Sequence, residues 1–92
     1  HVIAAKCVAF DEASTPEFCT YAKTVIENAQ ALAQGLKEEG FRIVTDGTEN
    51  HMVIVDVSSL KLTGRQAENA LRLAHITCNR NAIPFDPNGA WY

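Results

Sequence analysis

The chain has 92 residues, of which 47% are hydrophobic, 21% charged and 8% aromatic. This composition is typical of one ordinary globular domain, and so short a chain buries one modest core rather than forming an enzyme with a cleft between two domains. Eleven acidic residues against eight basic ones give a net charge of -3 without a basic cluster. That balance argues against binding to nucleic acid or to an anionic membrane.

The cysteines and the N-terminal hydrophobic residues bear on the cellular compartment of the protein. Cys7, Cys19 and Cys78 are odd in number and widely spaced, which is typical of a reducing compartment, so we expect a cytoplasmic protein. Because Lys6 and Asp11 interrupt the first hydrophobic run, the sequence predicts neither a membrane span nor a signal peptide. The chain starts without methionine and stops just after a turn. We therefore expect both ends to be cut rather than native.

Two helices are predicted in the first 40 residues. An apolar stripe predicts a helix over residues 1–13, formed by Val2, Ile3, Cys7 and Phe10. Thr15 followed by Pro16 is typical of the start of a second helix, because the hydroxyl caps free N–H groups and proline suits the first helical position. Its apolar positions repeat at helical spacing as far as Leu36, and Gly40 is expected to end it in a left-handed conformation.

A small sheet and a third helix are predicted next. The hydrophobic period changes from 3.6 to 2, which predicts an antiparallel hairpin of strands 41–45 and 51–57. Thr63 and Gln66 have the spacing of a capping box and predict a short helix, followed by a brief strand at 76–78. The order helix, helix, strand, strand, helix, strand predicts an α+β fold. We expect a small antiparallel or mixed three-stranded sheet with helices on one face.

The sequence contains no recognisable catalytic motif. His1, His51 and His75 lack the spacing of metal ligands, so no metal site is predicted. Lys6 lies on the polar flank of the first predicted helix and is expected to be solvated rather than to form a Schiff base. The cysteines lie at or near apolar positions and are expected to behave as small hydrophobic residues. No catalytic residue is therefore predicted in these 92 residues.

One polar segment near the C-terminus suggests ligand binding. Asn79 and Asn81 bracket Arg80 at the end of the predicted third strand. A carboxamide carries a donor and an acceptor side by side, so it can pair at two points with the edge of a heterocycle. The alternative is that the two asparagines only hold a turn.

Several separate motifs, in the same order and spacing, resemble serine hydroxymethyltransferases. They are HVIAAKCVAF at 1–10, TPEF at 15–18, GTENHMVIVD at 47–56, LTG at 62–64 and NRNAIPFDP at 79–87. The resemblance implies a pyridoxal-phosphate enzyme of fold type I. Such enzymes interconvert L-serine and tetrahydrofolate with glycine and 5,10-methylenetetrahydrofolate, and they act as homodimers or dimers of dimers.

The resemblance also implies which parts of the enzyme are missing. The family's cofactor lysine follows a Thr-Thr-Thr-His run upstream of the matching segment, and the arginine that binds the substrate carboxylate lies downstream. Neither stretch occurs here, and Lys6 matches a different lysine. Residues 1–13 would be the terminal helix of the large domain, and residues 14–92 part of the small C-terminal domain. No cofactor is expected to bind this piece alone.

One functional position is carried over from the family. Asn81 matches the second asparagine of the family's Asn-Lys-Asn segment, which helps to bind the folate, with Arg80 replacing the usual lysine. Trp91 is a weaker folate candidate, because the family often has Ser-Pro-Phe where this chain has Gly-Ala-Trp.

Three hypotheses follow from the sequence. The first is an inactive fragment of a serine hydroxymethyltransferase, one-carbon metabolism being the function of the complete enzyme. The alternative is a self-standing ligand-binding or regulatory module derived from such a domain. The third is a structural piece that assembles with the rest of its parent protein and self-associates when isolated, because the stripe of the first helix has no local partner.

Overall fold

The computed structural model describes residues 1–89. Three helices and two short strands make up the regular structure of these residues, together with 3₁₀ turns at Val44–Asp46 and Ser58–Leu60. In chain order the elements are α1 (Val2–Ala13), α2 (Pro16–Glu38), β1 (Arg42–Ile43), β2 (Val55–Asp56) and α3 (Gly64–Leu73). The α+β class predicted from the sequence is confirmed.

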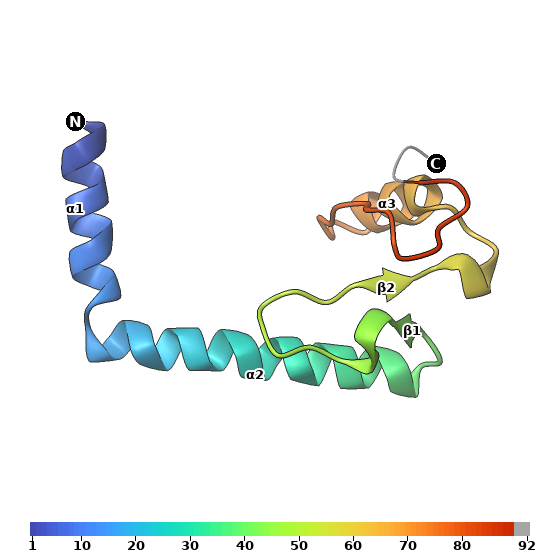
Figure 1. Cartoon of the computed structure of the whole chain (residues 1–92), viewed down its shortest axis with the longest axis horizontal. Helices are drawn as coiled ribbons and strands as arrows, with labels where there is room; N and C mark the ends of the chain where they lie inside the picture. Colours follow the sequence, from blue (N-terminus) through green and yellow to red (C-terminus); the bar gives the residue numbers. More distant parts are fainter. Residues whose placement is uncertain (90–92) are drawn as a thin grey trace.

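The two N-terminal helices meet at a sharp bend, which we call the elbow. In Figure 1, α1 stands steeply away from α2, and the two helices diverge from Ser14 and Thr15. The Thr15 hydroxyl accepts a hydrogen bond from the Phe18 N–H at 3.3 Å and donates one to the Glu12 carbonyl at 2.7 Å. Thr15 therefore caps α2, as predicted, and also ties α2 to the end of α1.

The second helix ends as the sequence predicts. Gly40 has a φ of 87°, a left-handed conformation that glycine adopts without a steric penalty. This conformation lets the Phe41 N–H donate to the Leu36 carbonyl at 3.0 Å, so the helix end is closed by its own backbone. The chain then reverses into β1, which packs on α2.

The strands pair antiparallel, as predicted, but they are much shorter than the predicted runs. Arg42 pairs with Asp56 and Ile43 pairs with Val55. The extended run stops after Ile43 because Thr45 and Asp46 have φ values of 66° and 61°, which turn the backbone away from its partner strand. Lys37 stabilises this turn, since its Nζ lies 2.7 Å from a carboxylate oxygen of Asp46.

The prediction of a third strand at residues 76–78 is wrong. Within residues 1–89 the sheet has two strands, and residues 76–78 have no regular structure. His75, with a φ of 62°, ends α3, and the Ile76 N–H donates to the Leu71 carbonyl at 2.9 Å. The first donor of the expected strand is thus used to close the helix.

The strands lie between two helices in Figure 1, with α2 below them and α3 above. In this view the two helices do not share one side of the strand pair, which differs from the expected layer with helices on one face. The start of α3 agrees with the prediction. The Gln66 N–H donates to the Thr63 hydroxyl, and the Gln66 side chain accepts from the Thr63 N–H at 2.9 Å, which completes the capping box.

The core is very small. Among the described residues, the buried hydrophobic side chains are Ala29, Ala33 and Ile43, and Asp56 is the buried charged one. The accessible surface is 7662 Å², whereas a compact protein of this mass exposes about 5,300 Å². The radius of gyration is 16.7 Å, against about 12 Å for a compact chain of this length. The chain is therefore an open arrangement with much uncovered hydrophobic surface.

Candidate functional site

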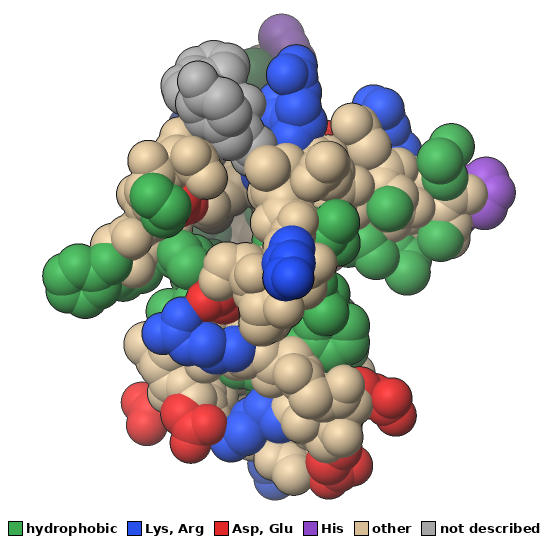
Figure 2. Space-filling model, turned by 90° about the vertical axis from the view of Figure 1, so that its right-hand side faces the viewer, with side chains coloured by type: hydrophobic (Ala, Val, Ile, Leu, Met, Phe, Trp, Pro, Cys, Tyr) green, Lys and Arg blue, Asp and Glu red, His purple; other side chains and the backbone are tan. Residues whose placement is uncertain are grey.

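A hollow lies between β2, α3 and residues 78–89 and has a volume of about 630 Å³. Its walls combine apolar side chains with amide, guanidinium and carboxylate groups, which include Val53, Val55, Leu71, Ile83, Arg42, Asp56, Asn79 and Asn81. Figure 2 shows the face of the molecule at this end, where hydrophobic side chains stay visible between acidic and basic ones. A concave wall with few polar groups is the usual form of a small-molecule site.

The structure brings the predicted polar segment to this hollow. Asn79, Arg80 and Asn81 all line it, although the segment is irregular rather than the end of a strand. Asn81 is exposed, so its amide is accessible to a ligand. The turn that follows is held by Asp86, whose carboxylate accepts from the N–H groups of Asn88 at 2.9 Å and Gly89 at 3.2 Å. Asp86 rather than Asn79 or Asn81 therefore makes the turn contacts of this segment.

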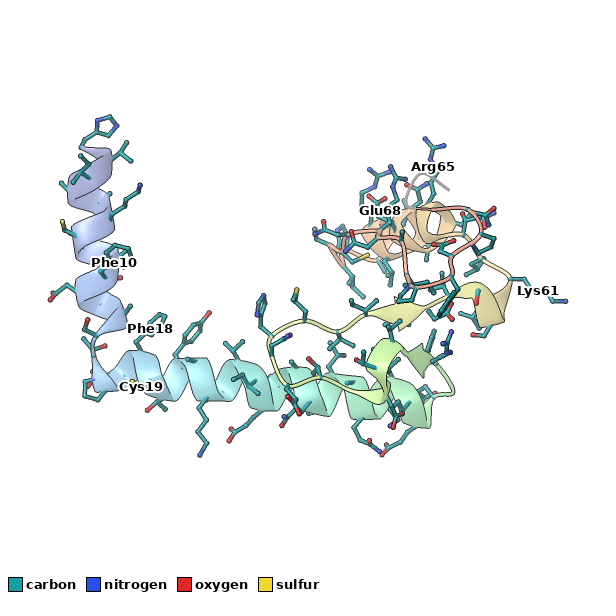
Figure 3. All side chains as sticks on the ribbon, in the orientation of Figure 1. Phe10, Phe18, Cys19, Lys61, Arg65 and Glu68 are labelled. Atoms are coloured by element: carbon teal, nitrogen blue, oxygen red, sulfur yellow. The ribbon has the colours of Figure 1, made fainter. Side chains whose placement is uncertain are left out.

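An ion pair joins the segment to α3. A guanidinium nitrogen of Arg80 lies 3.4 Å from a carboxylate oxygen of Glu68, and both side chains are partly buried. Figure 3 shows Glu68 on α3, with Arg65 of the same helix directed away from the rest of the molecule. This pair could not be predicted from the sequence, because the eleven residues between its members span a helix end and an irregular segment.

A second ion pair, between Arg42 on β1 and Asp56 on β2, also lines the hollow. Asp56 is 3% exposed, its carboxylate binds the guanidinium of Arg42 on β1, and the Ser58 N–H donates to it at 2.9 Å. Hydrogen bonds from the hydroxyl and the N–H of Ser58, together with Arg42, lower the pKa of Asp56 even though burial acts in the opposite direction. Asp56 is thus a charged anchor for both strands. A carboxylate inside a run of β-branched residues was the available signal in the sequence.

The other residues weighed in the sequence lie away from the hollow or differ from expectation. Cys7 and Cys19 are exposed rather than packed as small hydrophobic residues, and Cys78 is partly exposed. Residues 1–89 contain no group of three histidine, cysteine, aspartate or glutamate side chains placed to hold a metal ion. Lys6 lies exposed on α1, and the hollow's lining does not include it. Trp91 lies outside the described residues.

Among residues 1–89, none of the helices combines the length and the hydrophobicity that crossing a bilayer requires.

The fold and the hollow define a class, an α+β segment whose hollow has an amide-bearing wall. The profile of the serine hydroxymethyltransferase family matches residues 1–91. The chain therefore belongs to the serine hydroxymethyltransferase family, as its resemblance to that family implied.

Individual relatives agree with the family match. The chain is 57% identical to a serine hydroxymethyltransferase of Salinispora tropica over 91 residues and 59% identical to one of Mycolicibacterium smegmatis over 92 residues. A serine hydroxymethyltransferase of Zymomonas mobilis is 61% identical over 87 residues. These matches cover 95% to 100% of this chain but only 19% to 20% of each relative. The chain thus spans about a fifth of the length of the curated relatives it matches.

Proposed function

We propose that this chain is a segment of a serine hydroxymethyltransferase that interconverts L-serine and tetrahydrofolate with glycine and 5,10-methylenetetrahydrofolate. The observation that carries the proposal is the family match over residues 1–91. The complete protein is then a fold type I transferase of one-carbon metabolism and glycine biosynthesis. The free cysteines, two of them exposed, support a reducing compartment such as the cytoplasm.

We assign residues 1–13 to the end of the large domain and residues 14–92 to the front of the small C-terminal domain. The elbow supports this boundary, since α1 and α2 diverge there and α1 buries none of its described residues against the rest of the chain. Limited proteolysis of the complete protein is the test. Cleavage near Ser14 and Thr15 that releases two folded parts would support the boundary, and cleavage confined to other sites would contradict it.

The contribution of this segment to the site is the folate-facing amide of Asn81. Its position on the hollow and its exposure support the assignment, because a pterin-like ring presents a donor and an acceptor side by side. In the complete protein, Asn81→Ala should raise the KM for tetrahydrofolate about tenfold, the usual cost of losing a two-point hydrogen bond. Asn28→Ala, on an exposed position of α2, is the matched control. Equal KM values for both variants would remove Asn81 from the site.

The cofactor of the complete enzyme, pyridoxal phosphate, supplies the electron sink for this chemistry. The residues of this segment do not fit it. No lysine among the described residues lines the hollow, and Lys6 is exposed on α1. The 92-residue polypeptide alone should therefore show no aldimine absorbance with pyridoxal phosphate and no turnover of serine. Turnover by this polypeptide would overturn the proposal.

We propose that the remaining protein covers the elbow, through the large domain and a second subunit of a homodimer or dimer of dimers. Figure 3 shows the side chains of Phe10 and Phe18 on the inner side of the bend, and the ring of Tyr21 lies 5.6 Å from that of Phe18. All three side chains are more than 40% exposed in this segment. Sedimentation of the isolated polypeptide should show self-association through this surface, whereas a concentration-independent monomer would contradict it.

A further inference from the structure

The segment that carries Asn81 has little attachment of its own. Its backbone and carboxylate hydrogen bonds are internal and join Asp86 with Ile83, Asn88 and Gly89. Among residues 1–89, the polar contact that ties positions 77–89 to another element is the ion pair of Arg80 with Glu68 on α3. The position of Asn81 therefore depends on this pair more than on secondary structure.

The environment of this pair differs from that of an ordinary surface pair. The side chains of Arg80 and Glu68 are 29% and 27% exposed, whereas those of Lys23 and Glu27 on α2 are 79% and 58% exposed. Partial exclusion of water strengthens the attraction between opposite charges, because less solvent screens it. Glu68 is also held by a capped helix, so one member of the pair has a fixed base.

We propose that Glu68 is a positioning residue, which holds Arg80 and thereby orients the neighbouring Asn81 toward a bound folate. This inference rests on the proposed folate role of Asn81. Adjacent Cα atoms are about 3.8 Å apart, so fixing residue 80 strongly restricts where the side chain of residue 81 can go. A ligand that binds a preordered amide does not lose affinity to the ordering of the segment. Glu68 itself need not touch the ligand.

The test uses four variants of the complete protein, Glu68→Gln, Asn81→Ala, the double variant, and Glu27→Gln as the control that removes an exposed ion pair on α2. Glu68→Gln keeps the size of the side chain and removes its charge. We expect it to raise the KM for tetrahydrofolate roughly fivefold with kcat nearly unchanged, the size of one lost partly buried ion pair. Glu27→Gln should leave both constants unchanged. The double variant should be no worse than Asn81→Ala, because both changes remove the same contact.

Two further measurements separate positioning from a general loss of structure. Amide hydrogen exchange in residues 77–83 should be several-fold faster in Glu68→Gln than in the unmodified protein, with α2 unchanged. The swapped pair, Glu68→Arg with Arg80→Glu, should recover most of the lost affinity. If the swapped pair binds folate as poorly as Glu68→Gln, attraction between these charges is not what positions the segment.

The outcomes distinguish this inference from the function on which it rests. If Asn81→Ala weakens folate binding and Glu68→Gln does not, the positioning role is overturned while the folate role of Asn81 stands. Additive losses in the double variant would also overturn it, since independent contacts add. If Asn81→Ala leaves binding unchanged, the folate role fails and the positioning of that contact fails with it. Faster exchange confined to residues 77–83 would then show a purely structural ion pair.

Discussion

The α1 side of the elbow and the contact between α2 and β1 contain similar kinds of hydrophobic residues but pack very differently. Phe10 and Ile3 on α1 are 70% and 78% exposed, whereas Ile43 on β1 is 5% exposed and Ala33 on α2 is 2% exposed. The difference arises because the second half of α2 has β1 folded against it and α1 has little beside it. An apolar stripe therefore identifies a face that needs covering, and a neighbouring element decides whether this chain covers it.

The largest expected effect tests the packed side of this comparison. Ile43→Ala in the complete protein should lower the free energy of unfolding by about 3 kcal/mol, because it leaves a cavity between β1 and α2. Ile43→Val, which removes one methyl group, should cost about 1 kcal/mol. Chemical denaturation measures both values. Equal costs for the two variants would mean that this small core is not closely packed.

A substitution at the elbow tests whether its hydrophobic side chains stay exposed in the complete protein. Phe10→Ala in the complete protein should lower the free energy of unfolding by about 2 kcal/mol if the remaining protein covers the elbow, because the Phe10 side chain is then withdrawn from water. Lys6→Ala, on the same helix, is the control and should change stability by less than about 0.5 kcal/mol. Calorimetry compares the two variants. A cost for Phe10→Ala as small as that of the control would show that the elbow stays in water.

Removing a helix-capping hydroxyl should lower the free energy of unfolding by a smaller amount, both at α3 and at the elbow. Thr63→Ala removes the hydroxyl that caps α3 and should cost about 1 kcal/mol. Thr15→Ala should cost more, because that hydroxyl also bonds the Glu12 carbonyl across the elbow. Denaturation curves of the two variants, with Thr24→Ala within α2 as a reference, measure the difference. A larger loss at Thr63 would mean that the elbow contact adds nothing.

The smallest expected effect is a pH dependence at the strand pair. The pKa of Asp56 is lower in the folded protein than its ordinary value, so its stabilising contribution is complete above about pH 4. That contribution is lost as the pH falls through the lowered folded-state pKa. Asp56→Asn should therefore show a weaker fall in stability on acidification below pH 4. Identical pH slopes in the two proteins would rule out this linkage.

Local signals in the sequence explain which parts of the fold could be predicted. Thr15 with Pro16, Gly40, and Thr63 with Gln66 marked helix ends, because the side chain or backbone that closes each end is a near neighbour in the chain. The strands were overestimated because alternation of β-branched residues does not reveal the left-handed turn at Thr45 and Asp46. The strand predicted at 76–78 failed for a similar reason, since closing α3 uses the Ile76 N–H.

The candidate site was only partly accessible from the sequence. Asn81 was identified from its amide chemistry and from family resemblance, and the structure places it on the hollow. Glu68 and Asp56 were not singled out, because their importance depends on partners 12 and 14 positions away along the chain. No spacing rule reports such a contact.

The sequence by itself determined the family, the three helices and their caps, and the antiparallel order of the two strands. These features depend on residue types at short separations, where the chain brings the interacting groups together without help. Tertiary structure alone decided which apolar faces are buried, where Arg80 finds its counter-ion, and that Asp56 becomes a buried charge. Those outcomes require distant segments to meet, and burial and electrostatic attraction depend on the meeting rather than on the residues alone.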